Sequence, residues 1–311
     1  MALTSEQEVK CKFCGSPNHK KHHAQERMFG SGEKFWYLEC DSCGSLQIKD
    51  VPDNLSDFYS GDYYSFTDLV YSSGFRQFLK RIRMKTFLAS GGKFFEPSYG
   101  YWLKKVKPKM TDAIADIGCG TGQLLYEFYA GGYQNLHGFD PFIKETKVIS
   151  KELTIWKKGI EESDFKFDLI MMHHSFEHME DPDHILKLCF EKLNPGGKLL
   201  IRTPVTDSQV WKEEGVYWVQ LDAPRHLIIP STEGMAISAK KQGFNLDEIE
   251  FDSTGFQFWG TEIYKKGLPL NPELVQGIFS QEEMAEFKEK ALWLNQEGKG
   301  DQVCFYLSKP F

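Results

Sequence analysis

The feature that most constrains this fold is a glycine-rich turn directly after a short apolar stretch. Residues 113–117 predict a strand, and the turn Asp116-Ile117-Gly118-Cys119-Gly120-Thr121-Gly122 leads from it into a predicted helix over 123–130. Glycines at such a strand-to-helix turn let the backbone pass close to a ligand. Asp140 ends the next predicted strand, where a carboxylate accepts hydrogen bonds from both ribose hydroxyls of an adenosine cofactor.

Strand and helix patterns alternate from about residue 112 to the end of the chain. Further helices are predicted from Pro182, with Asp181 as its N-cap, and from about Thr232. The predicted strands cover 113–117, 135–139, 154–156, 167–172, 198–201, 247–251 and 302–307. Repeated strand–helix units indicate an α/β fold, a doubly wound, mostly parallel, seven-stranded Rossmann-like sheet whose last strand is antiparallel.

Four of the 7 cysteines form two C-x-x-C knuckles near the N-terminus. The pairs are Cys11 with Cys14 and Cys40 with Cys43, and each pair is followed by a glycine. This spacing lets two thiolates reach one ion from a tight turn, and two knuckles complete a tetrahedral structural Zn²⁺ site. Unliganded reduced thiols and a redox C-x-x-C remain as alternatives. We expect a small zinc ribbon with a hairpin before its second knuckle.

Composition limits the partners and the location of the protein. The formal net charge is −7, which provides no global positive field for nucleic acid. No apolar run is long enough for a membrane span and residues 1–10 do not look like a signal peptide. We therefore expect a cytoplasmic protein without membrane insertion. We expect a zinc-ribbon module at 1–52, an aromatic and helical linker and lid at 53–108, and the main domain at 109–311.

The turn and its surroundings resemble the class I S-adenosylmethionine-dependent methyltransferases. The resemblance covers about residues 110–250 and rests mainly on Asp116-x-Gly118-x-Gly120-x-Gly122 together with Asp140. It implies that Gly118 and Gly120 lie under the methionine moiety of S-adenosyl-L-methionine and that Asp140 holds its ribose. The complete cofactor-binding set that it implies is Asp116, Gly118, Cys119, Gly120, Gly122, Asp140, Pro141, Ile160, Glu161, His173, His174 and Ser175, with Ile160 and Glu161 at the adenine.

The flanking segments resemble a narrower group, the bacterial methyltransferases that modify sugars and glycans. The ribbon, the aromatic element at 62–66 and the segment 222–227 carry this resemblance. It implies O- or C-methylation of a small-molecule acceptor such as a sugar, nucleotide-sugar or glycan precursor, with nucleic acid an unlikely partner. Two alternatives remain open: an RNA methyltransferase whose ribbon holds RNA, and a non-catalytic cofactor-binding scaffold.

Histidines are the best candidates for a general base if the acceptor is a hydroxyl or an acidic carbon. The candidates are His226, which is preferred, His174 and His178, with Glu177 as an orienting partner. The run from His174 to His178 also matches the H-x-x-E-H pattern of zinc peptidases. It follows a strand directly, so we expect a loop there and no catalytic metal on a helix.

Substrate contacts are expected from two further places. Arg225 is suited to grip a phosphate or carboxylate, although an ion pair within the protein is an equally good use for it. Tyr63, Tyr64 and Phe66 could form an aromatic lid or pack the ribbon against the main domain.

Overall fold

The structure is a computed structural model that describes residues 9–59, 68–97, 100–271, 275 and 277–311. Its strands are β1 (His19–Gln25), β2 (Lys34–Cys40), β3 (Leu46–Ile48), β4 (Ile114–Ile117), β5 (Leu136–Phe139), β6 (Lys147–Ser150), β7 (Leu153–Trp156), β8 (Phe167–His173), β9 (Leu193–Pro204), β10 (Ile228–Ile229), β11 (Asn245–Phe251) and β12 (Gln302–Ser308). Its α-helices are α1 (Gly74–Ala89), α2 (Leu103–Val106), α3 (Gln123–Gly131), α4 (Pro182–Lys192), α5 (Gln209–Glu214), α6 (Thr232–Lys241), α7 (Phe256–Lys265) and α9 (Gln281–Gln296).

The main sheet of the described chain has eight strands in the order β11-β12-β9-β8-β4-β5-β7-β6. The central strands β9, β8, β4, β5 and β7 are parallel, and β12 is antiparallel to β9 as the sequence predicts. The prediction of seven strands is wrong by one. The extra strand, β6, pairs antiparallel with β7 at the sheet edge, and none of its four residues is buried, so it shows no apolar strand pattern in the sequence.

The helices begin and end where the local sequence provides caps. The Asp181 side chain accepts a hydrogen bond from the main chain of His184, and Pro182 occupies the first turn of α4, as predicted. α3 ends at Gly132, which has a φ of 107°, a conformation that suits glycine. The basic helix α1 stops at Ala89, just before the glycine pair Gly91-Gly92.

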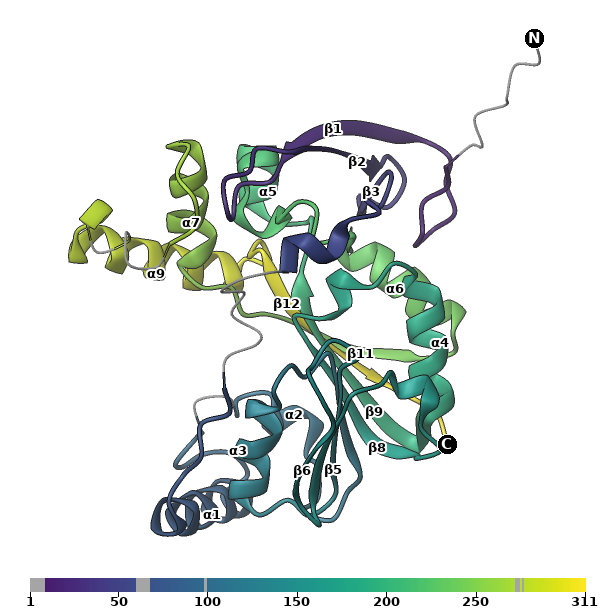
Figure 1. Cartoon of the computed structure of the whole chain (residues 1–311), viewed down its shortest axis with the longest axis vertical. Helices are drawn as coiled ribbons and strands as arrows, with labels where there is room; N and C mark the ends of the chain where they lie inside the picture. The colour runs from purple at the N-terminus through teal and green to yellow at the C-terminus, as the bar shows by residue number, and fades with distance from the viewer. Residues whose placement is uncertain (1–8, 60–67, 98–99, 272–274, 276) are drawn as a thin grey trace.

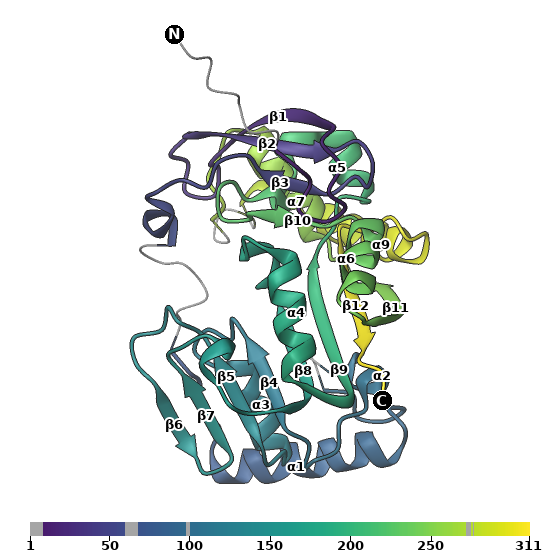
Figure 2. The same ribbon diagram turned by 90° about the vertical axis from the view of Figure 1, so that its right-hand side faces the viewer.

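A second sheet, with the order β1-β2-β3-β10, forms the ribbon. β1 and β2 are the predicted hairpin. The fourth strand, β10, comes from the segment after β9 and pairs with β3 through Ile228 opposite Gln47 and Ile229 opposite Leu46. Figures 1 and 2 show this sheet at one end of the molecule and α1 at the other, with the main sheet between them.

The ribbon shares its core with the segment after β9. Tyr37, Leu46 and Ile48 from the ribbon are buried in one cluster with Trp218 and Ile229. Burial of such large side chains contributes about 1.5–3 kcal/mol for each residue. The ribbon is therefore held against the main domain by a continuous apolar interface. None of the helices in the described part of the chain combines the length and apolar character needed to cross a membrane.

Candidate active site and metal centre

The glycine turn connects β4 to α3 and is held by hydrogen bonds to the neighbouring strand. The main-chain N–H of Gly118 donates to the carbonyl of Phe139 at 2.8 Å, and that of Gly120 donates to Asp140 Oδ2 at 2.9 Å. Gly118, Gly120 and Gly122 have φ values of 70°, 54° and 87°. Since side chains disfavour this region, glycine at these positions keeps the turn tight.

Gly118 also lies against the segment that leaves β8. A Cβ atom placed on Gly118 would be 2.4 Å from Ser175 Cβ, which is a steric overlap. The buried Ser175 hydroxyl donates to the carbonyl of Ile117 at 2.6 Å. The structure therefore brings together three predicted cofactor residues, Gly118, Asp140 and Ser175, at the carboxyl ends of adjacent parallel strands.

Two buried carboxyl groups give the turn an unusual electrostatic character. Asp116 is 3% exposed and Asp140 is 7% exposed. Burial, and then the nearby charge of Asp140, raise the pKa of Asp116 to about 8. Asp140 accepts hydrogen bonds from the main chain of Gly120 and of Phe142, one at each carboxylate oxygen. An ionised carboxylate has further lone pairs for acceptance, so Asp140 keeps acceptor capacity for a ligand.

The roles of the remaining predicted cofactor residues stay predictions, and the structure shows the environment of each. Ile160 is buried in the same apolar cluster as Phe139, whereas the Glu161 side chain is exposed. Phe142 was not predicted from the sequence, yet it is 81% exposed just after Asp140. An aromatic residue directly beyond the second strand was the available signal, because an exposed ring there can stack on a base. The other predicted positions have these environments: Cys119 half-buried, Pro141 exposed and His173 half-buried with a buried Nε2 atom.

A second polar cluster joins the exit of β8 to the segment before β10. Glu177 and His178 lie in a single 3-10 turn, Phe176–His178, so the H-x-x-E-H run is not on an α-helix. Glu177, His178 and His226 each place a ligand-type atom within 4.8 Å of the others. His174 Nδ1 also lies 3.4 Å from Glu177 Oε1. All four predicted catalytic residues are therefore neighbours in space, although His226 is distant from the others in sequence.

Both histidines of this cluster bond a main-chain carbonyl through Nδ1. His178 Nδ1 lies 2.9 Å from the carbonyl of Arg225, and His226 Nδ1 lies 2.7 Å from that of Gln220. These contacts assign the proton to Nδ1 and leave Nε2 with its lone pair. Burial, and then the charge of His178, lower the pKa of His226 to about 4. His226 is therefore a weaker base than the near-neutral one that we expected.

Glu177 is fully buried and ionised. Its Oε2 accepts a hydrogen bond from the Thr203 hydroxyl at 2.9 Å, while Oε1 has no hydrogen-bond partner among the described residues. Burial alone would raise the pKa of this carboxyl, but contact with His174 and the charges of the nearby histidines lower it to about 2. A buried charge with one unsatisfied oxygen is costly unless a cation or donor meets it.

His174 links this cluster to the end of the main sheet. Its φ of 51° is a left-handed conformation for a non-glycine residue, and such strain is concentrated at functional sites. Arg202 Nη1 donates to His174 Nε2 at 3.0 Å, which assigns the His174 proton to Nδ1. That nitrogen lies 3.4 Å from Glu177 Oε1 without forming a hydrogen bond.

Arg225 does not serve as the predicted substrate grip. Its side chain is fully buried, and the guanidinium pairs with Asp222 at 2.6 Å and with Glu26 at 2.9 Å. Two carboxylates neutralise the guanidinium, so no charge is left for a substrate anion. The alternative of an internal ion pair is the one observed, and it ties the ribbon residue Glu26 to the segment before β10.

The predicted aromatic lid of Tyr63, Tyr64 and Phe66 lies outside the described residues. Tyr59, just before it, was not predicted, yet its hydroxyl is 3.0 Å from His178 Nδ1 and donates to the carbonyl of Arg225 at 3.2 Å. The only available signal was the aromatic character of the segment, which does not tell which ring reaches the histidines.

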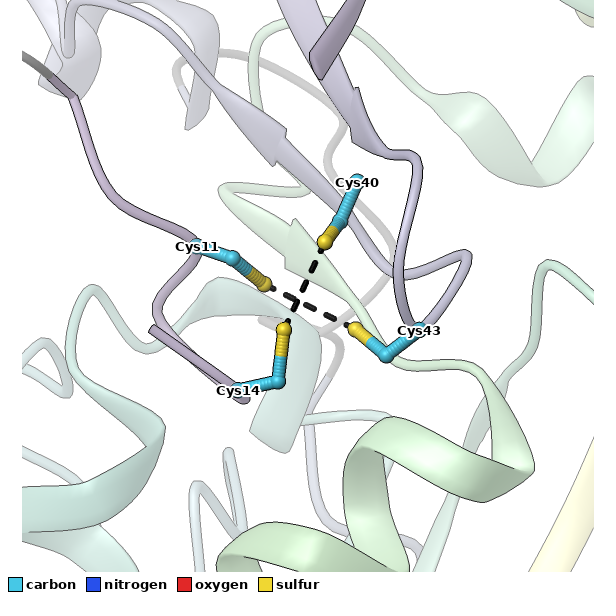
Figure 3. Close-up of side chains that lie close together, drawn as sticks. All are labelled: Cys11, Cys14, Cys40 and Cys43. Carbon is cyan, nitrogen blue, oxygen red and sulfur yellow. Dashed lines mark hydrogen bonds between the residues drawn. The ribbon is translucent and has the colours of Figure 1, made fainter. Parts of the chain in front are cut away.

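The four cysteines of the two knuckles converge on one point (Figure 3). Sγ of Cys11 is 3.6 Å from that of Cys43, and Sγ of Cys14 is 3.4 Å from that of Cys40. Thiolates bound tetrahedrally at about 2.3 Å from Zn²⁺ stand roughly 3.8 Å apart, so the cluster is close to the size that the ion requires. The pKa of Cys43 is lowered to about 5, mainly by the hydrogen bond from Cys11. Four cysteine sulfur atoms at this spacing fit Zn²⁺.

Comparison with known proteins gives a family match. A family described as "Methyltransferase domain" matches residues 86–249, just over half of the chain. Among solved structures, the phosphoethanolamine N-methyltransferase 2 of Haemonchus contortus, in complex with S-adenosyl-L-methionine, is 22% identical. The match covers 78% of this chain and 61% of that one, with a TM-score of 0.42.

Curated relatives are named tRNA U34 carboxymethyltransferase. The protein of Helicobacter acinonychis is 32% identical over 113 residues, which are 30% of this chain and 41% of the relative. That of Sulfurovum sp. is 30% identical over 106 residues, 31% of this chain and 35% of the relative. The chain thus spans less than half the length of these relatives.

These relatives contradict two predictions made from the sequence. The sugar, nucleotide-sugar or glycan acceptor is wrong, because the relatives are named for a tRNA acceptor. The expectation that nucleic acid is an unlikely partner is wrong for the same reason. The error came from giving a loose resemblance in the flanking segments, and a negative total charge, more weight than the alternative of an RNA methyltransferase whose ribbon holds RNA.

Proposed function

We propose that this chain, which belongs to the methyltransferase domain family and is an S-adenosylmethionine-dependent enzyme, transfers a methyl group to RNA. The proposal that the acceptor is RNA rests on one observation, which is that relatives at about 30% identity are named as enzymes that act on tRNA. Those relatives are named as carboxymethyltransferases, so tRNA is the first acceptor to test. The group transferred is proposed to be the methyl group of S-adenosyl-L-methionine.

The cofactor is proposed to lie on the glycine turn between β4 and α3. Asp140, with its two main-chain donors, would accept the ribose hydroxyls, and Phe142 would cover the adenine. The methionine moiety would cross Gly118 and Gly120 toward Ser175. Its positively charged groups would lie beside Asp116 and Asp140, where a cation favours ionised carboxylates.

Methyl transfer from a sulfonium is an in-line displacement, so the protein mainly has to position the acceptor and exclude water. The segment that leaves β8 carries Ser175 against the turn and carries Glu177 and His178 two and three residues later. The proposed acceptor position is therefore between the turn and the polar cluster, with His174 among the groups nearest to it.

The ribbon is proposed to hold RNA. Its first two strands present the exposed lysines Lys20, Lys21 and Lys34. Trp36 is 46% exposed and stacks on His23, with ring centroids 4.4 Å apart. Lysines that track phosphates and aromatic rings that stack on bases are the usual elements of a single-strand surface. Zn²⁺ at the four cysteines is proposed as the structural ion that keeps this surface folded.

The first experiment is transfer of the labelled methyl group from S-adenosyl-L-methionine to total tRNA, with ribosomal RNA and nucleotide sugars in parallel. The proposal predicts labelling of tRNA, and loss of labelling in the Asp140→Ala variant. Labelling of nucleotide sugars alone, or of no RNA by a folded and cofactor-binding protein, would contradict it.

The ribbon surface is tested by the salt dependence of tRNA binding. The double variant Lys20→Ala/Lys21→Ala should weaken tRNA binding. It should also make the negative slope of the logarithm of the binding constant against the logarithm of the salt concentration shallower by about 1–2. The matched control is Arg76→Ala/Lys85→Ala on α1, at the opposite end of the molecule (Figure 2). An equal effect of both pairs would show that binding is not directed to the ribbon.

A further inference from the structure

We propose that Glu177, His178 and His226 form a binding site for a divalent transition-metal ion, separate from the cysteine cluster. Their three ligand-type atoms lie within 4.8 Å of one another. Two imidazoles and one carboxylate are a common set for Zn²⁺, Fe²⁺ and related ions, and they leave coordination positions open. The proposal concerns metal binding and does not depend on the identity of the methyl acceptor.

The hydrogen bonds of the two histidines are those of metal ligands. Nδ1 of each ring is bonded to a main-chain carbonyl, that of Arg225 for His178 and that of Gln220 for His226. This arrangement fixes the ring and directs the Nε2 lone pair away from the backbone, as the outer partners of metal-bound histidines do. The Tyr59 hydroxyl, 3.0 Å from His178 Nδ1, adds to the same restraint.

The carboxylate provides the second, independent observation. Glu177 is 0% exposed, and Thr203 satisfies its Oε2. Its Oε1 is without a hydrogen-bond partner among the described residues. Native proteins rarely leave a buried charged oxygen unmatched. A cation between Oε1 and the two Nε2 atoms would satisfy this oxygen and both nitrogen lone pairs at once.

The size of the cluster predicts a small closing movement. Ligands at about 2.0–2.2 Å from a metal stand roughly 3.0–3.5 Å apart, which is less than the 4.8 Å limit observed here. Side-chain rotations that move each ligand atom by about 1 Å would bring the three atoms to this spacing. Glu177 and His178 lie on a short 3-10 turn and His226 lies before β10, so ion binding would tie the exit of β8 to the segment that completes the ribbon.

The site differs from the H-x-x-E-H pattern that the sequence contains. In that pattern two histidines four residues apart bind one ion from a helix. Here His174 is engaged with Arg202 through Nε2, and His226 takes the second histidine position. The ion would therefore lie between two segments of the chain and face the region where the acceptor is proposed to bind.

The test is the number of ions bound by each purified chain after dialysis against micromolar Zn²⁺, measured by elemental analysis. The wild-type protein should hold two ions, and Glu177→Gln and His226→Gln should each hold one. The matched control is His184→Gln, an exposed histidine on α4, which should keep two. Retention of two ions by folded Glu177→Gln would overturn the proposal.

Co²⁺ substitution is measured on the wild-type protein alone, so a variant that fails to fold cannot affect the result. The cysteine site should give intense sulfur-to-metal absorption with the first equivalent. The second equivalent should add only weak bands of nitrogen and oxygen ligands. A wild-type protein that binds one ion, with thiolate absorption alone, would overturn the proposal. Neither measurement uses RNA or S-adenosyl-L-methionine, so its failure is distinct from failure of the proposed function.

Discussion

The cysteine cluster and the glycine turn hold their groups in place by different means. In the cluster, the Sγ atoms are 3.6 Å apart between Cys11 and Cys43 and 3.4 Å apart between Cys14 and Cys40. In the turn, main-chain donors of Gly118 and Gly120 meet acceptors of the next strand. The first arrangement needs a bound cation once its thiols ionise. The second is satisfied by the protein alone.

This difference implies that the cysteine cluster and the glycine turn should respond differently to the loss of the ligands proposed for them. A turn satisfied by its own backbone keeps its shape without a cofactor, which makes it preorganised for binding. A cluster of thiols loses its main restraint when the ion leaves. The four predictions below test this contrast, beginning with the largest expected effect.

The largest effect is expected from Cys43→Ser. Loss of one ligand should remove much of the binding free energy of the ion, which is on the order of 10 kcal/mol for structural zinc sites. Amide hydrogen exchange should accelerate across the ribbon strands β1–β3 and change little in β4 and β5. Cys189→Ala, at a buried cysteine outside the cluster, should keep the ion and the slow exchange. Equal protection of the ribbon in both variants would contradict the contrast.

Asp140→Ala should weaken the binding of S-adenosyl-L-methionine by about 100-fold, because charge-assisted hydrogen bonds are each worth about 1.5–3 kcal/mol. Calorimetric titration measures this change. Asp140→Asn is the matched variant, since it keeps the shape but removes the charge, and it should show an intermediate affinity. An unchanged affinity in the alanine variant would place the ribose elsewhere.

Two glycines with similar backbone angles separate close approach from backbone strain. Gly118 has a φ of 70° and lies against Ser175, whereas Gly15 in the first knuckle has a φ of 78° and no atom within 4 Å of its added Cβ. Gly15→Ala should cost about 1–2 kcal/mol of strain. Gly118→Ala should cost a further 1–3 kcal/mol or so from overlap, measured by chemical unfolding.

The double variant Gly118→Ala/Ser175→Gly provides the control for that measurement. It removes the overlapping Cβ of residue 175 but keeps the strained backbone angle at residue 118. Because Ser175→Gly also loses the hydrogen bond to Ile117, the double variant is compared with Ser175→Gly alone, and the difference should be the strain cost only. If Gly118→Ala and Gly15→Ala were equally destabilising, the close approach between the turn and the β8 exit would not contribute.

Taken over one pH unit, the smallest effect concerns the pH dependence of stability. The folded pKa of Asp116 is raised to about 8 by burial, while the unfolded carboxyl titrates near 4. Its contribution is fully present below pH 4 and is lost as the pH rises toward 8, because the unfolded state releases the proton first. Without cofactor, Asp116→Asn should therefore gain stability relative to wild type by at most about 1.4 kcal/mol for each pH unit in this window. A constant difference between the two proteins would contradict the raised pKa.

The elements that could be predicted from the sequence are those whose signal is local. The C-x-x-C spacing indicated the converging cysteines, and the strand-to-helix glycine turn indicated the position of Asp140 beside Gly120. β6 escaped prediction because this edge strand has no buried residue and therefore no apolar pattern. β10 escaped because its two residues become a strand only by pairing with β3.

The polar cluster was predicted in part, since Glu177, His178 and His226 were all named as candidates. Their mutual approach depends on how the segment before β10 packs against the exit of β8, where the main chain of Leu227 donates to the carbonyl of Glu177. No local pattern encodes that contact. The pairing of Arg225 with Asp222 and Glu26 was hidden for the same reason, because Glu26 lies in the ribbon.

The late position of β10 has a consequence for synthesis on the ribosome. Ser45 beside β3 and Ser231 beside β10 contact each other across 186 positions of sequence. At about 5–20 residues per second, translation needs roughly 10–40 seconds to cover that interval. During this time β3 is an open strand edge on the nascent chain. Both knuckles have left the ribosome by then, but the sheet beside them closes only when the second half of the protein arrives.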